Sequence, residues 1–184
     1  MKKFLLTLGK VLLIIIAVLL GFLWYAGFFE RAYITEKETG PYYALIDEVA
    51  PYQDPATTRN NIFNALLEED IMSEKAVAIS ERPFRESLIN KTGWILETKN
   101  VQLAQNLEPP YQIIKIPKEQ RVVADFPYDN SFSIMAGSYI AYRKLLQYVQ
   151  RHNYESGRLI EIYDDGEKRI FYHLNTASDS QSGS

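Results

Sequence analysis

The sequence predicts an α+β domain in which two pseudo-repeated β-α-β-β units form one curved antiparallel sheet with both helices on one face, preceded by one transmembrane helix. Three observations lead to this prediction. Residues 11–29 form one uncharged apolar run. Beyond it, β-branched and aromatic stretches alternate with amphipathic ones, and turn residues separate them. The order strand, strand, helix, strand, strand occurs twice, which indicates a duplication within one domain.

Composition narrows the classes of protein to consider. The 184 residues are 47% hydrophobic and 23% charged, which suits one globular domain plus the apolar run. Three of the 20 basic and one of the 23 acidic residues lie in positions 1–30, which leaves residues 31–184 with a formal charge of −5. That charge disfavours a nucleic-acid groove and mildly favours cationic partners. The absence of cysteine excludes disulfides, thiolate metal sites and cysteine nucleophiles.

The apolar run Val11–Phe29 predicts a membrane anchor within residues 1–30. Nineteen residues at helical rise span about 28 Å, close to the ~30 Å hydrocarbon core of a bilayer. The basic residues Lys2, Lys3 and Lys10 precede this run. The positive-inside rule then predicts a single-pass membrane protein with a cytoplasmic N-terminus and its domain on the extracytoplasmic side, periplasmic or outer.

A cleaved signal peptide is the alternative for the same segment, since a basic region before an apolar run is common to both. The run is long for a signal peptide, and Ala26-Gly27 is only a weak cleavage site. Trp24 and Tyr25 suit the membrane–water interface at the end of a spanning helix. We therefore expect the segment to remain as a signal anchor.

The first half of the soluble part starts with two β-prone runs separated by the turn residues Thr39-Gly40-Pro41. Asp54-Pro55 predicts a helix start, with aspartate as the N-cap and proline at the first helical position. The apolar stripe of this helix consists of Ile62, Phe63, Leu66 and Leu67. The predicted elements are strands at residues 32–38, 42–49, 75–80 and 93–97 and a helix from 54 to about 70.

The second half repeats this order. Asp129-Asn130-Ser131 supplies N-cap chemistry for a helix that ends near His152, where a cationic last turn suits the helix dipole. Its apolar stripe consists of Ala141, Leu145, Tyr148 and Val149. The predicted strands are residues 111–117, 121–126, 158–163 and 168–174. The domain therefore covers residues 31–175, and the polar residues 176–184 predict a disordered tail.

The strand at residues 158–163 is the centre of the predicted site. Alternation places Ile160 and Ile162 on one face and Glu161 and Tyr163 on the other. If the helices cover the isoleucine face, Glu161 and Tyr163 point into whatever the sheet encloses on its opposite side. A carboxylate there needs a cation, a donor or water.

Pairing the third strands of the two halves sets Ala78 against Glu161 and Ser80 against Tyr163. One half then offers small residues where the other offers a carboxylate and a phenol. A ligand cleft between pseudo-symmetric halves would have this asymmetry, although unselected drift would produce it as well.

Several segments resemble the GyrI-like small-molecule-binding domain family. They are Gly40-Pro41-Tyr42, Phe126-Pro127-Tyr128 leading to Phe132-Ser133-Ile134, and Arg158-Leu159-Ile160-Glu161-Ile162-Tyr163. With the N-terminal anchor, they resemble the membrane-anchored branch that includes the testis-expressed endoplasmic-reticulum-phagy receptor. The resemblance covers most of residues 32–174 and rests on the order and spacing of these segments.

The resemblance implies a sheet with a central groove that takes cationic or amphipathic compounds. In drug-binding members a glutamate of the last EIY-type strand contacts the ligand among aromatic side chains, and Glu161 corresponds to it. No helix-turn-helix region precedes the domain, so we do not expect a transcription-regulator role. The nine residues after Asn175 lack an acidic-aromatic motif, so we do not expect the recruitment role of the phagy receptor.

We predict Glu161 as the ligand-contacting carboxylate. The purely structural alternative is an ion pair between Glu161 and Arg158 or Arg169. Aromatic rings that attract a cation would surround the ligand, although each ring is individually more often plain core. The predicted ligand-binding residues are Glu161, Tyr163, Tyr128, Phe126, Tyr42 and Trp94.

The predicted function is therefore a membrane-tethered domain that binds a small cationic or amphipathic molecule and does not transform it. One alternative is a non-catalytic module that holds a protein partner at the membrane. A second is a GyrI-like hydrolase in which Glu161 activates water. We expect no cofactor, no nucleic-acid partner and no metal, since the only histidines, His152 and His173, are far apart in the sequence.

Overall fold

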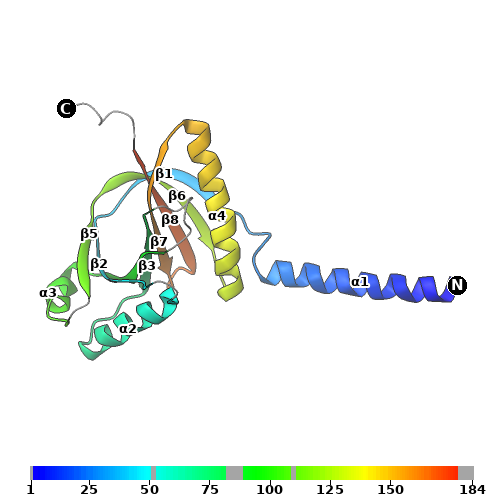
Figure 1. The fold of residues 1–184 in the computed structure, drawn as a ribbon, viewed down its shortest axis with the longest axis horizontal. Helices are drawn as coiled ribbons and strands as arrows, with labels where there is room; N and C mark the ends of the chain where they lie inside the picture. The colour runs from blue at the N-terminus through cyan, green and yellow to red at the C-terminus, as the bar shows by residue number, and fades with distance from the viewer. Residues whose placement is uncertain (1, 51–52, 82–88, 109–110, 178–184) are drawn as a thin grey trace.

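The computed structural model of the chain describes residues 2–50, 53–81, 89–108 and 111–177. A long N-terminal helix projects away from an α+β domain that is built on one eight-stranded sheet (Figure 1). Every pair of neighbouring strands is antiparallel. The predicted α+β class with one antiparallel sheet is confirmed, and the pseudo-repeat stays a prediction.

The elements follow the predicted order, and their ends differ from the predicted ones by a few residues. The helices are α1 Lys2–Tyr25, α2 Pro55–Glu68, η1 Thr98–Asn100, α3 Val101–Ala104 and α4 Ser131–His152. The strands are β1 Tyr33–Thr39, β2 Tyr42–Glu48, β3 Lys75–Ser80, β4 Lys91–Leu96, β5 Gln112–Ile116, β6 Glu119–Pro127, β7 Glu155–Asp164 and β8 Arg169–Ala177. The sequence does not predict η1 and α3, because such short helices show no apolar period.

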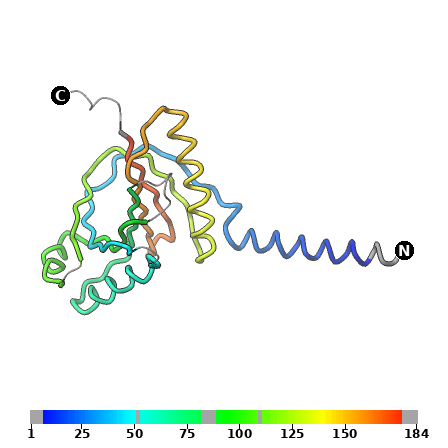
Figure 2. The backbone as a smooth tube through the Cα atoms, viewed as in Figure 1, coloured from blue at the N-terminus to red at the C-terminus, as the bar shows by residue number. Residues whose placement is uncertain are grey.

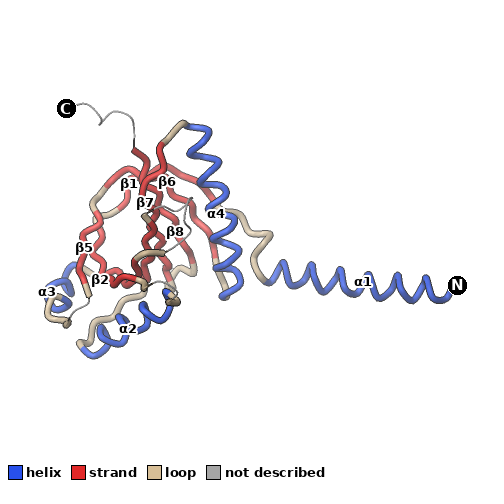
Figure 3. Tube along the Cα trace, in the orientation of Figure 1, coloured by secondary structure: helices blue, strands red, loops and turns tan. Residues whose placement is uncertain are grey.

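The two halves of the domain exchange their first strands. The sheet order is β1-β6-β8-β7-β3-β4-β2-β5, so β1 pairs with β6 although a tight turn joins it to β2. Likewise β5 precedes β6 but pairs with β2. The two turns pass so closely that a Cβ on Gly40, whose φ is +92°, would lie 2.8 Å from the carbonyl oxygen of Pro117. The turns thus link both edges of the sheet, which curls with α2 and α4 outside it (Figure 3).

Side-chain caps begin both long helices of the domain. The Asp54 carboxylate accepts a hydrogen bond from the Ala56 amide at 3.0 Å, and Pro55 occupies the first turn as predicted. Asn130 and Ser133 form a reciprocal capping box at the start of α4. These caps fix where the two helices start, and therefore which side chains stand at their N-terminal ends.

The helices cover the face of Glu161 and Tyr163, so the premise that they cover the isoleucine face is wrong. Tyr163 packs into the apolar clusters under both α4 and α2. Ile160 and Ile162 instead pack against other strands, in a cluster of sheet residues only. The physical reason is the curl of the sheet, because its inner face packs on itself and is as apolar as the face under the helices.

The pairing of β3 with β7 joins the two halves at the centre of the sheet. The predicted opposition of Ala78 and Glu161 is confirmed. The predicted opposition of Ser80 and Tyr163 is wrong, because residue numbers rise along one strand of an antiparallel pair and fall along the other. Ser80 lies opposite Leu159, and Tyr163 lies opposite Ala76.

α1 is long and apolar enough to span a membrane from Thr7 to Tyr25, and none of that stretch is buried against the domain. It carries the N-terminus far from the domain, whereas the chain leaves β8 on the opposite side (Figure 2). β8 extends to Ala177, so Thr176 and Ala177 continue a strand and do not belong to a disordered tail. Residues 178–184 of the predicted tail lie outside the described residues.

Candidate ligand-binding site

A cavity of about 450 Å³ lies where the N-terminal ends of α2 and α4 meet strands β3, β4 and β7. Residues from the first and the second half of the domain both contribute to its wall. The lining residues are Asp54, Pro55, Ala56, Arg59, Asn60, Ala76, Ile89, Trp94, Tyr128, Ile134, Tyr163 and Asp165. The position of the cavity follows from the two helix caps and from the β3–β7 pairing.

Glu161 lies one layer behind this wall and is 3% exposed. One carboxylate oxygen accepts a hydrogen bond from the Tyr142 hydroxyl, and the other accepts one from the Tyr163 hydroxyl at 2.6 Å. Burial raises the pKa of Glu161 above its ordinary value, and the two tyrosine donors oppose that rise. The group is therefore a satisfied buried carboxyl that protonates more readily than an exposed glutamate.

The purely structural alternative for Glu161, an ion pair with Arg158 or Arg169, is wrong. Arg158 donates to Glu81 at 3.0 Å, and Arg169 donates to Asp125 at 2.6 Å. Both arginines therefore have other carboxylate partners, and Glu161 depends on neutral hydroxyl donors.

Tyr163 connects the buried carboxyl to the cavity. Its hydroxyl is held by Glu161, while its ring is part of the cavity wall. The guanidinium of Arg59 lies over this ring, 5.7 Å from the ring centroid. Such a contact is a cation–π interaction. Lys168 makes a second one, with its ammonium 5.6 Å from the centroid of the Tyr128 ring, so two aromatic rings of the wall already face cations of the protein itself.

Two carboxylates, a second phenol and the side chain of Asn60 also belong to the polar part of the wall. The Tyr128 hydroxyl donates to Asp165 at 2.5 Å, and burial together with this bond raises the pKa of Tyr128. Asp54 contributes the second carboxylate beside its capping bond. Within the residues that the structure describes, no cluster of three histidine, aspartate or glutamate side chains could hold a metal ion.

The predicted ligand-binding residues fall into three places. Tyr163, Tyr128 and Trp94 line the cavity, with Glu161 behind them. Phe126 is fully buried in the core under α4. Tyr42 belongs to the opposite face of the sheet, where it lines another cavity of about 420 Å³. Contact of any of them with a ligand stays a prediction.

Sequence reasoning missed several side chains of this site, among them Tyr142, Arg59 and Asp165. Tyr142 follows Ala141 of the predicted apolar stripe, so its place near the sheet could have been noticed. Arg59 and Asp165 look like solvated surface in the sequence, and no local signal distinguishes them. Only the folded chain brings Arg59, from the first half, over Tyr163, from the second.

Comparisons with known proteins support the fold. No family model matches the chain, and no curated protein is significantly similar to it. An integron cassette protein from the mobile metagenome of Vibrio cholerae has a TM-score of 0.50 at 8% identity, covering 80% of this chain and 99% of that one. An uncharacterized conserved protein from Listeria innocua has a TM-score of 0.51 at 8% identity, covering 80% of this chain and 93% of that one.

At this level of identity the likeness shows a shared fold and carries no activity over to this chain. Membership of the GyrI-like family and of its membrane-anchored branch stays a prediction from the sequence.

Proposed function

We propose that the chain is a membrane-tethered, GyrI-like domain that binds a small cationic or amphipathic molecule in the cavity and releases it unchanged. The observation that carries this proposal is the Arg59 guanidinium over the Tyr163 ring on the cavity wall. A ligand cation that displaces Arg59 would meet the same ring face.

The size and chemistry of the cavity support this proposal. Small-molecule sites usually measure about 300–1,000 Å³ and combine apolar and aromatic walls with a few polar groups. This cavity has about 450 Å³, the rings of Trp94, Tyr128 and Tyr163, and the carboxylates of Asp54 and Asp165. An aromatic cation that meets carboxylates at the rim would satisfy both features.

The same geometry favours binding over hydrolysis. A general base must reach the water that it activates. Both oxygens of Glu161 accept bonds from tyrosines, and the residue lies behind the cavity wall. We therefore place the role of Glu161 in holding the Tyr163 ring in position.

Fluorescence titration of the full chain in detergent with ethidium, and with an anionic naphthalene sulfonate dye, tests the proposal. Tyr163→Leu removes the π face, and we expect it to weaken ethidium binding by about 2- to 30-fold, the range that one cation–π contact supplies. Arg59→Gln frees the ring face, and we expect it to strengthen ethidium binding and to weaken binding of the anionic dye. Arg151→Gln, an exposed arginine in the last turn of α4, is the matched control and should change neither.

A saturable ethidium response that Tyr163→Leu leaves intact would move binding away from this cavity. No response in wild type or in Arg59→Gln would overturn the proposal.

A further inference from the structure

α4 carries a stripe of large apolar side chains on the side that faces away from the sheet. Phe132, Met135 and Tyr139 are 48%, 70% and 63% exposed. Their spacing of i, i+3 and i+7 places them on one side of the helix, while Ala141 and Leu145 on its other side are buried. Single exposed apolar side chains are ordinary, but three in a row mark a surface that contacts something apolar.

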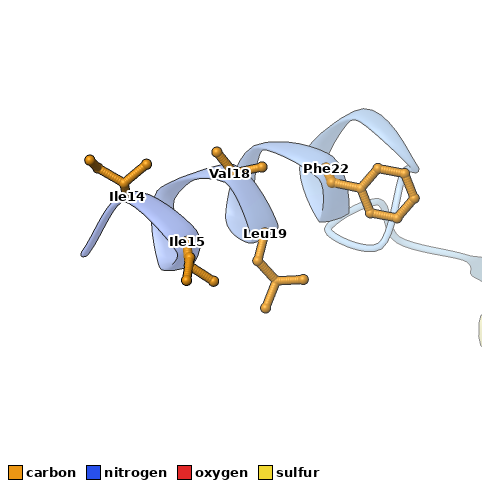
Figure 4. A pocket seen from close by; sticks show the side chains of 5 residues that line it. All are labelled: Ile14, Ile15, Val18, Leu19 and Phe22. Atoms are coloured by element: carbon orange, nitrogen blue, oxygen red, sulfur yellow. The ribbon is translucent and has the colours of Figure 1, made fainter. Parts of the chain in front are cut away.

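This stripe begins at the end of α1. The Phe132 ring packs edge-on against Phe22 of α1, with the ring centroids 5.5 Å apart. The Asn130 side-chain amide donates to the backbone oxygen of Tyr25 at 3.0 Å. Phe22 closes a row of apolar side chains that project from α1 (Figure 4). The start of α4 is therefore held at the last turn of the segment that could span a membrane.

The direction of α4 places the whole stripe at the level of the C-terminal end of α1. Figure 1 shows α4 crosswise to α1, between that helix and the sheet. Spanning helices tilt by about 20° on average from the membrane normal. A helix that crosses α1 at its end therefore runs close to the membrane plane, with the outward stripe toward the bilayer.

The charges of α4 match such a surface. Its 22 residues include no aspartate or glutamate, although residues 31–184 have a formal charge of −5. Its exposed charged side chains include Arg143 and Arg151. A helix with an apolar stripe and basic flanks is typical of helices that lie in an anionic lipid interface.

We propose that α4 lies along the surface of the membrane that α1 spans, with Phe132, Met135 and Tyr139 in the interfacial layer. This inference rests on the membrane anchor that is part of the proposed function. Ile134 of the cavity wall directly precedes Met135 of the stripe, so the cavity would lie next to the membrane surface. The cavity is held at the membrane surface, where amphipathic molecules concentrate.

The test uses the full chain in vesicles of phosphatidylcholine and phosphatidylglycerol. Because the chain has no cysteine, Met135→Cys and Tyr139→Cys each accept one environment-sensitive fluorophore. Val18→Cys reports the anchor, and Leu103→Cys on α3 reports a site on the opposite side of the domain from α1. The readout is loss of fluorescence when part of the lipid carries a nitroxide quencher near the headgroup.

We expect quenching of the labels at Met135, Tyr139 and Val18 but not at Leu103, independently of the protein-to-lipid ratio. Quenching at Val18 alone would overturn the inference and leave the anchor intact. A Met135 label that is shielded from water without lipid quenching, and only at high protein-to-lipid ratio, would assign the stripe to contact with a second copy of the chain. That result would also overturn the inference. A label at Val18 that stays in water would remove the anchor itself, and both proposals would fail.

Discussion

Glu161 is a buried carboxyl on the face of the sheet that the helices cover. Its carboxyl has no basic partner within hydrogen-bond reach among the bonds that the structure describes, and two tyrosine hydroxyls satisfy it. A buried acid in this setting favours its protonated form, because desolvation penalises the charge. The tyrosines limit that preference, and one of them supplies the ring of the cavity wall.

Glu161→Gln should therefore change how stability depends on pH. A raised native pKa means that Glu161 contributes stability fully below its ordinary pKa of 4.5, and that this contribution is lost as pH rises through the native value. Relative to wild type, we expect the glutamine variant to gain stability as pH rises across that window, by at most about 1.4 kcal/mol per pH unit. Urea unfolding of both proteins in detergent from pH 4 to 8 measures this difference.

The comparison with the variant is needed because His173 changes the stability of the protein with pH in the opposite direction. Burial lowers the pKa of His173 to about 3, so its contribution is lost as pH falls below its ordinary value of 6.5. This effect is common to both proteins and cancels in their difference. A difference that does not vary with pH would show that the pKa of Glu161 is not raised.

At the scale of an element, the seating of α4 on the sheet depends on one small residue. Gly137 lies over Phe126 of β6, and a Cβ at this position would come within 2.6 Å of the phenyl ring. The helix can therefore approach the sheet closely, which also brings Tyr142 to Glu161. The sequence shows a glycine inside a helix, where it costs free energy and therefore invites a packing explanation.

Gly137→Ala should destabilise the domain by about 1–3 kcal/mol, because the added methyl group overpacks a rigid core. Thermal and urea unfolding of the full chain measure the loss. Gly21→Ala in α1 is the matched control, since a Cβ there meets nothing within 4 Å. Recovery of part of the lost stability by Phe126→Leu would identify the clash as the cause, whereas an unchanged stability in Gly137→Ala would contradict it.

At the scale of the whole molecule, Arg121 ties together the points where the two halves exchange strands. It is 1% exposed, and its guanidinium donates to the backbone oxygens of Thr39 and Pro117 and to the side chain of Asn175. Thr39 ends β1, and Pro117 belongs to the β5–β6 turn. One side chain thus holds both crossing turns and β8.

Arg121→Met should cost about 3–5 kcal/mol, because it leaves several buried acceptors without donors. Urea unfolding of the full chain measures the cost, and Arg151→Met at an exposed position should stay within about 0.5 kcal/mol of wild type. A loss equal to that of the exposed control would show that the crossings hold without this arginine.

The orientation of the whole chain in the membrane is a prediction from its lysines. With a cytoplasmic N-terminus, the label site of Leu103→Cys should react with a membrane-impermeant maleimide in intact cells. Replacement of Lys2, Lys3 and Lys10 by glutamine should reduce that reaction, because the basic residues set the orientation. Labelling that requires lysis of the cells would place the domain in the cytoplasm. A mature chain shorter by roughly two to three kDa on immunoblots would indicate a cleaved signal peptide.

The sequence alone determined the elements of this protein, because local patterns carry that information. The N-cap at Asp54, the bounds of β3 and the apolar run of α1 depend on residues close together in the chain. The duplicated order also predicted the class of sheet. Opposition of Ala78 and Glu161 followed from pairing the two third strands.

Only the tertiary structure decided which face the helices cover and what surrounds Glu161. Both faces of a curled sheet are apolar, so the alternation in β7 predicts two faces without telling them apart. Tyr142 reaches Glu161 across 19 residues of sequence, and Arg121 reaches Thr39 across 82. Contacts at such separations depend on how all strands pair together, and no local pattern contains that information.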